Sequence, residues 1–280
     1  MIRILSILVG LFFTAALAWS FVNGAANVIS EGQLKPASAE HEFHKHPEKL
    51  ALASDGLFGK FDKQQLQRGF QVYKEVCSAC HSLRLVAFRD LKALGYNDDE
   101  VKAIAAGFQV PGLDQATGEA NNRPGLATDY FPKPFANDIA ARAANNNAVP
   151  PDLSLMTKAR HDGAAYVRSL LIGYQNQPAA LLKEFPDAKT PTGLHYNPYF
   201  ANLNLAMAPP LTAEGQVSYK DGTKATVDQM AQDVSAFLVW TAEPKLDKRK
   251  QTGWPVVGFL LFATILGYMA YRQIWADKKH

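Results

Sequence analysis

The chain has 280 residues, 48% of them hydrophobic, and a formal net charge of +3 at pH 7. Once the charged residues of its two apolar ends are set aside, the stretch 40–250 is formally neutral. This argues against nucleic-acid binding, which needs a clustered basic surface.

The first predicted element is an apolar segment over residues 4–22, which follows a short start containing Arg3. The segment is typical of a secretory signal peptide, with cleavage after Ala39 or near Ala26. Its 19 residues are also enough to span a bilayer uncleaved. We favour cleavage, and in either case the segment delivers the following domain across a membrane.

An amphipathic helix is predicted over residues 62–76, where apolar residues recur at helical spacing. It leads directly into Cys77-Ser78-Ala79-Cys80-His81, which holds the only two cysteines of the chain. C-x-x-C-H is the attachment signature of a c-type haem, in which both thiols bind the porphyrin and the histidine binds iron. A redox dithiol would need a βαβ context, zinc would need two more ligands, and a simple disulfide would leave His81 unexplained. The motif therefore predicts one covalent haem c, with Cys77 and Cys80 as thioether partners and His81 as axial ligand.

The rest of the central stretch is predicted to be mainly helical with few strands. Helices are expected around residues 89–94 and 98–107, in a short stretch capped by Asp162, and over 227–240, where Thr226 and Gln229 form a capping box. One small hairpin is expected where residues 217–219 precede Asp221-Gly222. Long loops rich in Gly, Pro and Asn separate these elements, and loops of that length are usually functional.

A six-coordinate electron-transfer haem needs a second axial ligand, normally Met or His. Two of the five methionines lie in the apolar ends, and Met230 lies on the apolar face of a predicted helix. Met207 lies in Ala206-Met207-Ala208-Pro209-Pro210, where two prolines restrict the chain and lower the entropy cost of holding a thioether in place. From the residues alone, Met207 competes on even terms with Met156 and His195 together.

A second apolar segment, over residues 254–271, is long enough to cross the hydrocarbon core of a bilayer. Trp254 and Trp275 stand near its ends, as interfacial anchors do. Basic residues flank both ends, so the positive-inside rule does not set the orientation. The export segment and the haem set the orientation instead: the haem domain is expected outside the cytoplasm and the C-terminal tail inside it. The stretch 244–251 is too short and charged for a long flexible tether.

An ordered set of motifs over residues 55–275 carries a family resemblance. The motifs are RGFQVY at 68–73 ahead of VCSACH at 76–81, ARAANN at 141–146, PPDLS at 150–154, KARH at 158–161, YNPYF at 196–200, MAPPL at 207–211, DGT at 221–223 with ATV at 225–227, DVSAFL at 233–238 and AEP at 242–244. On this set the chain resembles cytochrome c1, the haem subunit of the bc1 complex (ubiquinol–cytochrome c oxidoreductase), in its alphaproteobacterial form.

The resemblance implies a class I cytochrome c-like haem domain with long loop insertions and one C-terminal transmembrane helix. It implies His81 and Met207 as the axial ligands and Arg160 as a partner of a haem propionate, an apt role because guanidinium binds carboxylate bidentately. It further implies that Tyr166 lies at the haem edge, and it assigns the pocket wall to Asn145 and Pro151. Some bacterial relatives brace the distal side with an extra cysteine pair that this chain lacks.

The function that the resemblance implies is a relay of single electrons from a Rieske iron–sulfur protein to a cytochrome c, beside cytochrome b in a dimeric complex. The chain would be the electron-transfer subunit of an oxidoreductase and do no bond chemistry on a substrate. Its parts would be a signal or membrane segment (1–39), a periplasmic haem domain (40–250), an anchor helix in the lipid of the bacterial inner membrane (251–275) and a cytoplasmic tail (276–280). The alternatives are an independent membrane-anchored carrier and a haem peroxidase, which would need an open distal position.

Overall fold

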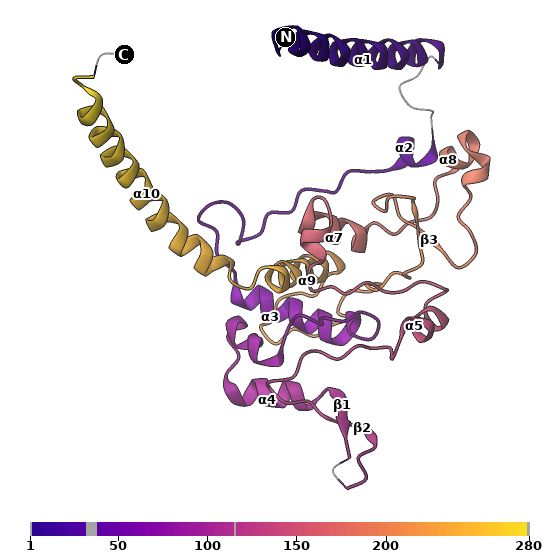
Figure 1. Cartoon of the computed structure of the whole chain (residues 1–280). Coiled ribbons are helices and arrows are strands. Elements are labelled where there is room, and N and C mark those ends of the chain that lie inside the picture. The colour runs from indigo at the N-terminus through magenta and orange to yellow at the C-terminus, as the bar shows by residue number, and fades with distance from the viewer. Residues whose placement is uncertain (1, 32–37, 115, 279–280) are drawn as a thin grey trace. The chain divides into compact units, whose positions relative to one another are not determined.

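The computed structural model describes residues 2–31, 38–114 and 116–278 (Figure 1). The chain divides into two compact units, residues 1–43 and 44–280, and each is treated by itself. The expectation of a mainly helical protein is confirmed. The few strands form two short antiparallel pairs within the described residues.

The first unit contains two helices, α1 (Ile2–Glu31) and α2 (Ala39–Phe43). Helix α1 covers the apolar segment and continues past it, because nothing in residues 23–31 breaks a helix: the stretch holds one glycine and no proline. The helix is therefore nine residues longer at its C-terminal end than the apolar segment 4–22.

The second unit holds the remaining elements. In chain order they are α3 (Lys63–Val72), a π-helical turn (Tyr73–Cys77), a 3₁₀ helix (Phe88–Leu94), α4 (Asp98–Ala106), β1 (Gln109–Leu113), β2 (Ala120–Pro124), α5 (Asp138–Ala144), α6 (Met156–Ala159), α7 (Gly163–Ile172), α8 (Ala179–Glu184), a 3₁₀ turn (Pro186–Ala188), β3 (His195–Tyr196), β4 (Asn204–Leu205), α9 (Val227–Ala242) and α10 (Leu246–Trp275). In the antiparallel β1–β2 hairpin, Pro111 lies opposite Asn122. In the β3–β4 hairpin, His195 lies opposite Leu205.

The core forms where α3 packs against α9 (Figure 1). Gly69 permits this contact: a Cβ on it would collide with the carbonyl oxygen of Asp233 and lie 2.7 Å from Cβ of Phe237. Aromatic rings fill the space beside the crossing. Phe237 lies 5.7 Å from Phe70 between ring centroids, and Phe131 lies 4.4 Å from Phe88. The two helices are thus held in fixed register next to the C-x-x-C-H segment.

Three local expectations change. Asp162 does precede α7, but it has a left-handed backbone (φ 61°) and its side chain pairs with His161 instead of capping. Thr226 does cap α9 by accepting from the Gln229 backbone N–H at 3.0 Å, whereas the Gln229 side chain bonds Asp233. The hairpin expected at residues 217–222 is wrong. Hairpins form instead at β1–β2 and β3–β4, where paired strands face each other across a turn.

Helices α1 and α10 are each long and apolar enough to cross a membrane. Helix α10 begins only four residues after the end of α9, so the stretch 244–251, expected to be too short for a long flexible tether, is itself mostly helical. Glu243 pairs with both Arg249 and Lys158, which ties the junction to the α6 region. The link between the soluble body and α10 is short and braced.

Candidate functional site

The C-x-x-C-H segment is shaped by a π-helical turn at the end of α3. The Ser78 backbone N–H donates to the carbonyl of Tyr73, five residues back, at 2.8 Å. Cys80 and His81 then both donate their backbone N–H to the carbonyl of Cys77, at 3.1 and 2.9 Å. Single π turns inside α-helices are frequent at functional sites. The expected straight helix into the motif is therefore correct up to Val72 and locally widened after it.

Cys77 and Cys80 are not joined in a disulfide, and both are half-buried. Burial raises the pKa of the Cys77 thiol to about 12, and the neighbouring Cys80 adds to the rise. Redox-active dithiols work through a thiolate whose pKa is lowered by nearby positive charge or a helix N-terminus. The environment of Cys77 is the opposite, which favours a structural attachment role over thiol–disulfide exchange.

His81 is presented as an oriented, neutral imidazole. Its Nδ1 lies 2.8 Å from the carbonyl oxygen of Pro151, so Nδ1 carries the proton and donates to that acceptor. Nε2 is then left with its lone pair, the arrangement that metal-bound histidines use. Burial lowers the pKa of His81. The hydrogen bond to the Pro151 carbonyl and the negative charge of Asp152 act to raise it, but burial outweighs them. The donor set therefore fits a haem iron on the Nε2 side.

Asp152 fixes the Pro151 carbonyl relative to the histidine. Its carboxylate accepts from the Ser82 hydroxyl at 2.7 Å and from the backbone N–H of Arg84 at 2.9 Å. The Leu153 backbone N–H donates to the Ser82 carbonyl at 2.9 Å. These bonds join the segment after His81 to the segment after Pro151. Burial favours a raised pKa for Asp152, but the hydrogen bonds outweigh it and the pKa is lowered.

Replacing Asp152 by asparagine is expected to cost about 1–3 kcal/mol of unfolding free energy at neutral pH, because hydrogen bonds to a charged acceptor are lost. The lowered pKa means that Asp152 stabilises the fold above its unfolded pKa and loses this contribution as pH falls through its folded pKa. The difference from the natural chain should thus shrink once pH drops below about 4. Chemical denaturation at several pH values measures this difference in unfolding free energy.

Asp99→Asn, on an exposed side chain of α4, serves as the control and should change the unfolding free energy little. A difference that stays constant down to low pH would contradict this role.

Met207 is half-buried and packs against the same core cluster as Cys77. The segment around it is held by polar contacts instead of a cysteine pair. The Tyr174 hydroxyl donates to the Met207 carbonyl at 3.0 Å. Gln216 donates from Nε2 to the Pro210 carbonyl at 2.8 Å and accepts from the backbone N–H of Thr212 at 3.0 Å. Tyr174 and Gln216 thus brace the Met207 strap (residues 206–210) on both sides.

Tyr174→Phe should loosen the strap while keeping the ring. Losing one neutral hydrogen bond costs about 1 kcal/mol, which would raise the apparent affinity of added imidazole for the ferric haem about fivefold if that ligand displaces Met207. A spectral titration with imidazole measures the change. Tyr130→Phe removes the hydroxyl of an exposed tyrosine and should leave the affinity unchanged. Equal affinities in all three proteins would mean that Tyr174 does not position Met207.

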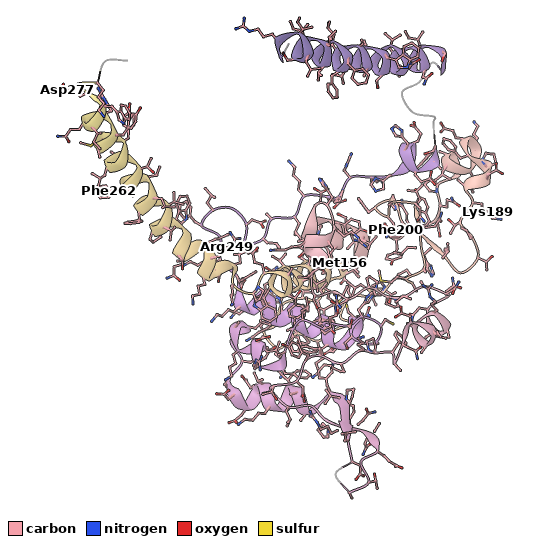
Figure 2. The ribbon with its side chains drawn as sticks, viewed as in Figure 1. Met156, Lys189, Phe200, Arg249, Phe262 and Asp277 are labelled. Atoms are coloured by element: carbon pink, nitrogen blue, oxygen red, sulfur yellow. The ribbon has the colours of Figure 1, made fainter. Side chains whose placement is uncertain are left out.

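The two competing distal candidates lie in different surroundings. Met156 begins α6, is half-buried and packs against the same core cluster (Figure 2). His195, on β3, lines a cavity of about 530 Å³ together with Tyr174 and Pro209. Its ring also meets the Tyr174 ring edge-on, with centroids 6.4 Å apart. Met156 thus resembles Met207 in its surroundings more than His195 does. Replacing each methionine in turn distinguishes which of them is the distal ligand.

Arg160 and Tyr166 lie close enough to interact. Burial raises the pKa of the Tyr166 phenol, and the nearby Arg160 guanidinium acts against that rise. Arg160 is exposed, and its Nη1 donates to the carbonyl of Ala159 at 3.2 Å. Asn145 differs, because its hydrogen bonds are local: its amide donates to the Ala141 carbonyl at 2.7 Å at the end of α5.

Sequence reasoning missed three residues that shape the site. Tyr73 donates its hydroxyl to the carbonyl of His81 at 3.1 Å, and Asp152 and Tyr174 act as described above. Asp152 lies inside the PPDLS motif, so the motif itself was a signal for it. Tyr73 looks like an ordinary apolar helix position in sequence, and Tyr174 follows the end of α7 at Ile172. A hydroxyl contact to a distant carbonyl leaves no sequence pattern in either case.

A mainly helical domain that presents two half-buried thiols and a neutral, oriented histidine in C-x-x-C-H is that of a c-type cytochrome. The sequence profile of the Cytochrome C1 family matches residues 52–278. The chain belongs to this family.

The chain is similar to family members from bacteria and from mitochondria. It is 46% identical over 239 residues to "Cytochrome c1" of Rhodospirillum rubrum, covering 80% of this chain and 86% of the relative. It is 43% identical over 242 residues to "Cytochrome c1, heme protein, mitochondrial" of Saccharomyces cerevisiae, covering 86% and 75%. A "Cytochrome b/c1" of Bradyrhizobium diazoefficiens is 42% identical over 269 residues, covering 90% of this chain and 39% of that protein.

Proposed function

We propose that this chain is the haem subunit of a bc1 complex and relays single electrons from a Rieske iron–sulfur protein to a cytochrome c. The observation that carries this proposal is the family match over residues 52–278 together with the oriented C-x-x-C-H histidine. The relative named cytochrome b/c1 supports a place beside cytochrome b. The chain contributes electron transfer to a quinol–cytochrome c oxidoreductase and no bond chemistry of its own.

Cys77 and Cys80 would hold one haem c covalently, and His81 and Met207 would be its axial ligands. The bound haem supplies a reversible one-electron couple at its iron. The Pro151 carbonyl keeps His81 in the tautomer that can bind metal, as its 2.8 Å bond to Nδ1 supports. A methionine thioether favours the reduced state and so raises the potential. Arg160, exposed beside Tyr166, would offset the charge of a propionate. Asn145 and Pro151 would line the pocket wall.

We further propose a class I cytochrome c-like domain over residues 40–250 that faces the periplasm of a bacterial inner membrane. Residues 1–39 would be an export or membrane segment, 251–275 a single transmembrane anchor in lipid, and 276–280 a cytoplasmic tail. The apolar length of α10 supports the anchor, and α1 supports export. Membership of the family also leads us to propose that the bc1 complex containing this chain is a dimer.

An independent membrane-anchored electron carrier is the alternative. Such a carrier needs a long flexible linker so that its haem domain can travel between partners. Here α10 starts four residues after α9, and Glu243 pairs with Arg249 and Lys158 across the junction. This braced connection favours a fixed subunit.

Purification of the tagged full chain in mild detergent tests the proposal. A subunit should bring cytochrome b and a Rieske protein with it, and the purified material should reduce cytochrome c when a quinol is added. The chain alone, loaded with haem but without a cytochrome b, would support the independent carrier. A high-spin haem that turns over peroxide would contradict both readings.

A further inference from the structure

Residues 52–60 form a preshaped loop next to the start of α10. The Asp55 backbone N–H donates to the Leu52 carbonyl at 2.9 Å, and the Lys60 N–H donates to the Ala53 carbonyl at 2.9 Å, which closes the loop. The Asp55 carboxylate accepts from the Leu52 N–H at 2.8 Å. Gly59 is required there, because a Cβ on it would collide with the carbonyl oxygen of Asp55. The loop therefore holds its shape through its own backbone.

The first two turns of α10 hold this loop. The Lys250 ammonium donates to three loop carbonyls, those of Ser54 at 2.7 Å, Gly56 at 2.6 Å and Gly59 at 3.3 Å. The Asp247 carboxylate accepts from the Phe61 backbone N–H at 3.1 Å. A charged donor that satisfies three carbonyls is a strong local clamp. The 52–60 loop is thus fixed beside the first two turns of α10.

Two large apolar side chains stand exposed on the loop. Leu57 is 67% exposed and Phe58 is 76% exposed. The Phe58 ring stacks on the Trp254 ring, with centroids 5.2 Å apart and planes at 16°. Trp254 is where the uninterrupted apolar stretch of α10 begins, and tryptophan is enriched at the membrane–water interface. The apolar surface of the loop is therefore continuous with the surface of α10.

We propose that the 52–60 loop is a second membrane contact, in which Leu57 and Phe58 enter the interfacial layer of the lipid bilayer beside Trp254. This inference rests on the proposed role of α10 as a membrane anchor. Lipid is the occupant that fits, because the loop is clamped at the end of the apolar stretch, where a bilayer surface would lie. Lys60 at the end of the loop and Lys248 in the first turn of α10 are exposed and suit the phosphates of lipid headgroups. With the loop in lipid, the soluble domain is held at two points instead of swivelling on one helix.

Nitroxide labelling of the haem-loaded full chain tests the contact. The only native cysteines of this chain would be consumed by haem attachment, so Leu57→Cys introduces its sole free thiol. The same preparation carrying the natural chain measures any labelling of the other subunits. Leu126→Cys is the matched control, since Leu126 is 57% exposed and belongs to the loop after β2. Phe262→Cys marks the middle of α10 (Figure 2). Each protein, purified with the subunits that accompany it, is labelled and then reconstituted into phosphatidylcholine vesicles. Relaxation enhancement by oxygen and by a polar nickel chelate then reports depth.

The label at residue 57 should collide several-fold more with oxygen relative to chelate than the label at 126, and less so than the label at 262, which lies deeper along α10. A label at 57 as chelate-accessible as that at 126, with 262 in lipid, would overturn the loop contact and leave the anchor intact. A label at 57 shielded from both reagents would also overturn it, because a protein subunit would then cover the loop. A chelate-accessible label at 262 would overturn the anchor and the loop contact together. The same relaxation measurement on a label at Phe58→Cys tests the neighbouring position.

Discussion

Replacing Met207 by leucine is expected to lower the reduction potential of the haem by about 0.1–0.3 V, a substantial part of the roughly 0.8 V range that axial ligands control. Leucine keeps the apolar volume but offers no lone pair to iron. The ferric state, which the thioether stabilises least, is then favoured, or the haem becomes five-coordinate and high-spin. A redox titration followed by optical spectroscopy measures both effects.

Met156→Leu is the matched control for this prediction, because Met156 is also half-buried and packs against the same core cluster. It should leave the potential and the spin state unchanged. If Met207→Leu changed neither and Met156→Leu changed both, the distal ligand would be Met156. If neither variant had an effect, His195 would become the candidate to replace next.

Asp233→Ala is expected to destabilise the protein by about 3 kcal/mol, since removing the buried member of this ion pair leaves Arg68 with only the partly exposed Asp221 as charged partner. Asp233 lies on α9 with no exposed side-chain surface, and Arg68 on α3 donates to it from Nε at 2.9 Å and Nη2 at 3.2 Å. Gln229 adds a third bond at 2.9 Å. The pair sits where α3 and α9 meet at Gly69, so the loss acts on the helix contact next to the haem motif. Denaturant unfolding followed by circular dichroism measures it.

Asp221→Asn is the control, since Asp221 binds the same guanidinium at 2.7 Å but keeps 30% of its side chain exposed. Solvent screens this outer bond, and its loss should cost less than about 1 kcal/mol. Similar losses for the two variants would show that burial of Asp233 does not decide its contribution. A loss near zero for Asp233→Ala would remove the pair as a stabiliser of the α3–α9 contact.

Much of the fold could be predicted because its signals are local. The period of apolar residues and Thr226 located α9 closely, and the apolar runs located α1 and α10. The hairpins could not be found this way. β1 and β2 carry glycine, proline and asparagine instead of alternating apolar residues, so their pairing depends on the chain around them. The left-handed backbone at Asp162 likewise depends on its neighbours.

The candidate site divides in the same way. Cys77, Cys80 and His81 were predictable because covalent haem attachment demands one short spacing. The residues that hold them are distant in sequence: Pro151 is 70 residues from His81, and Tyr174 is 33 residues from Met207. Contacts of that range arise from tertiary packing, which no local pattern encodes. The bracing of the Met207 strap without a cysteine pair could therefore be described only from the structure.

We expect Cys77 and Cys80 to bind one haem covalently through thioether bonds. A pyridine haemochrome spectrum combined with the intact mass of the purified chain tests it most directly, and the same mass locates any N-terminal cleavage. We expect a c-type haemochrome and a chain heavier by one haem, which acidic acetone does not extract. A chain mass without haem, or a haem that acidic acetone removes, would contradict it.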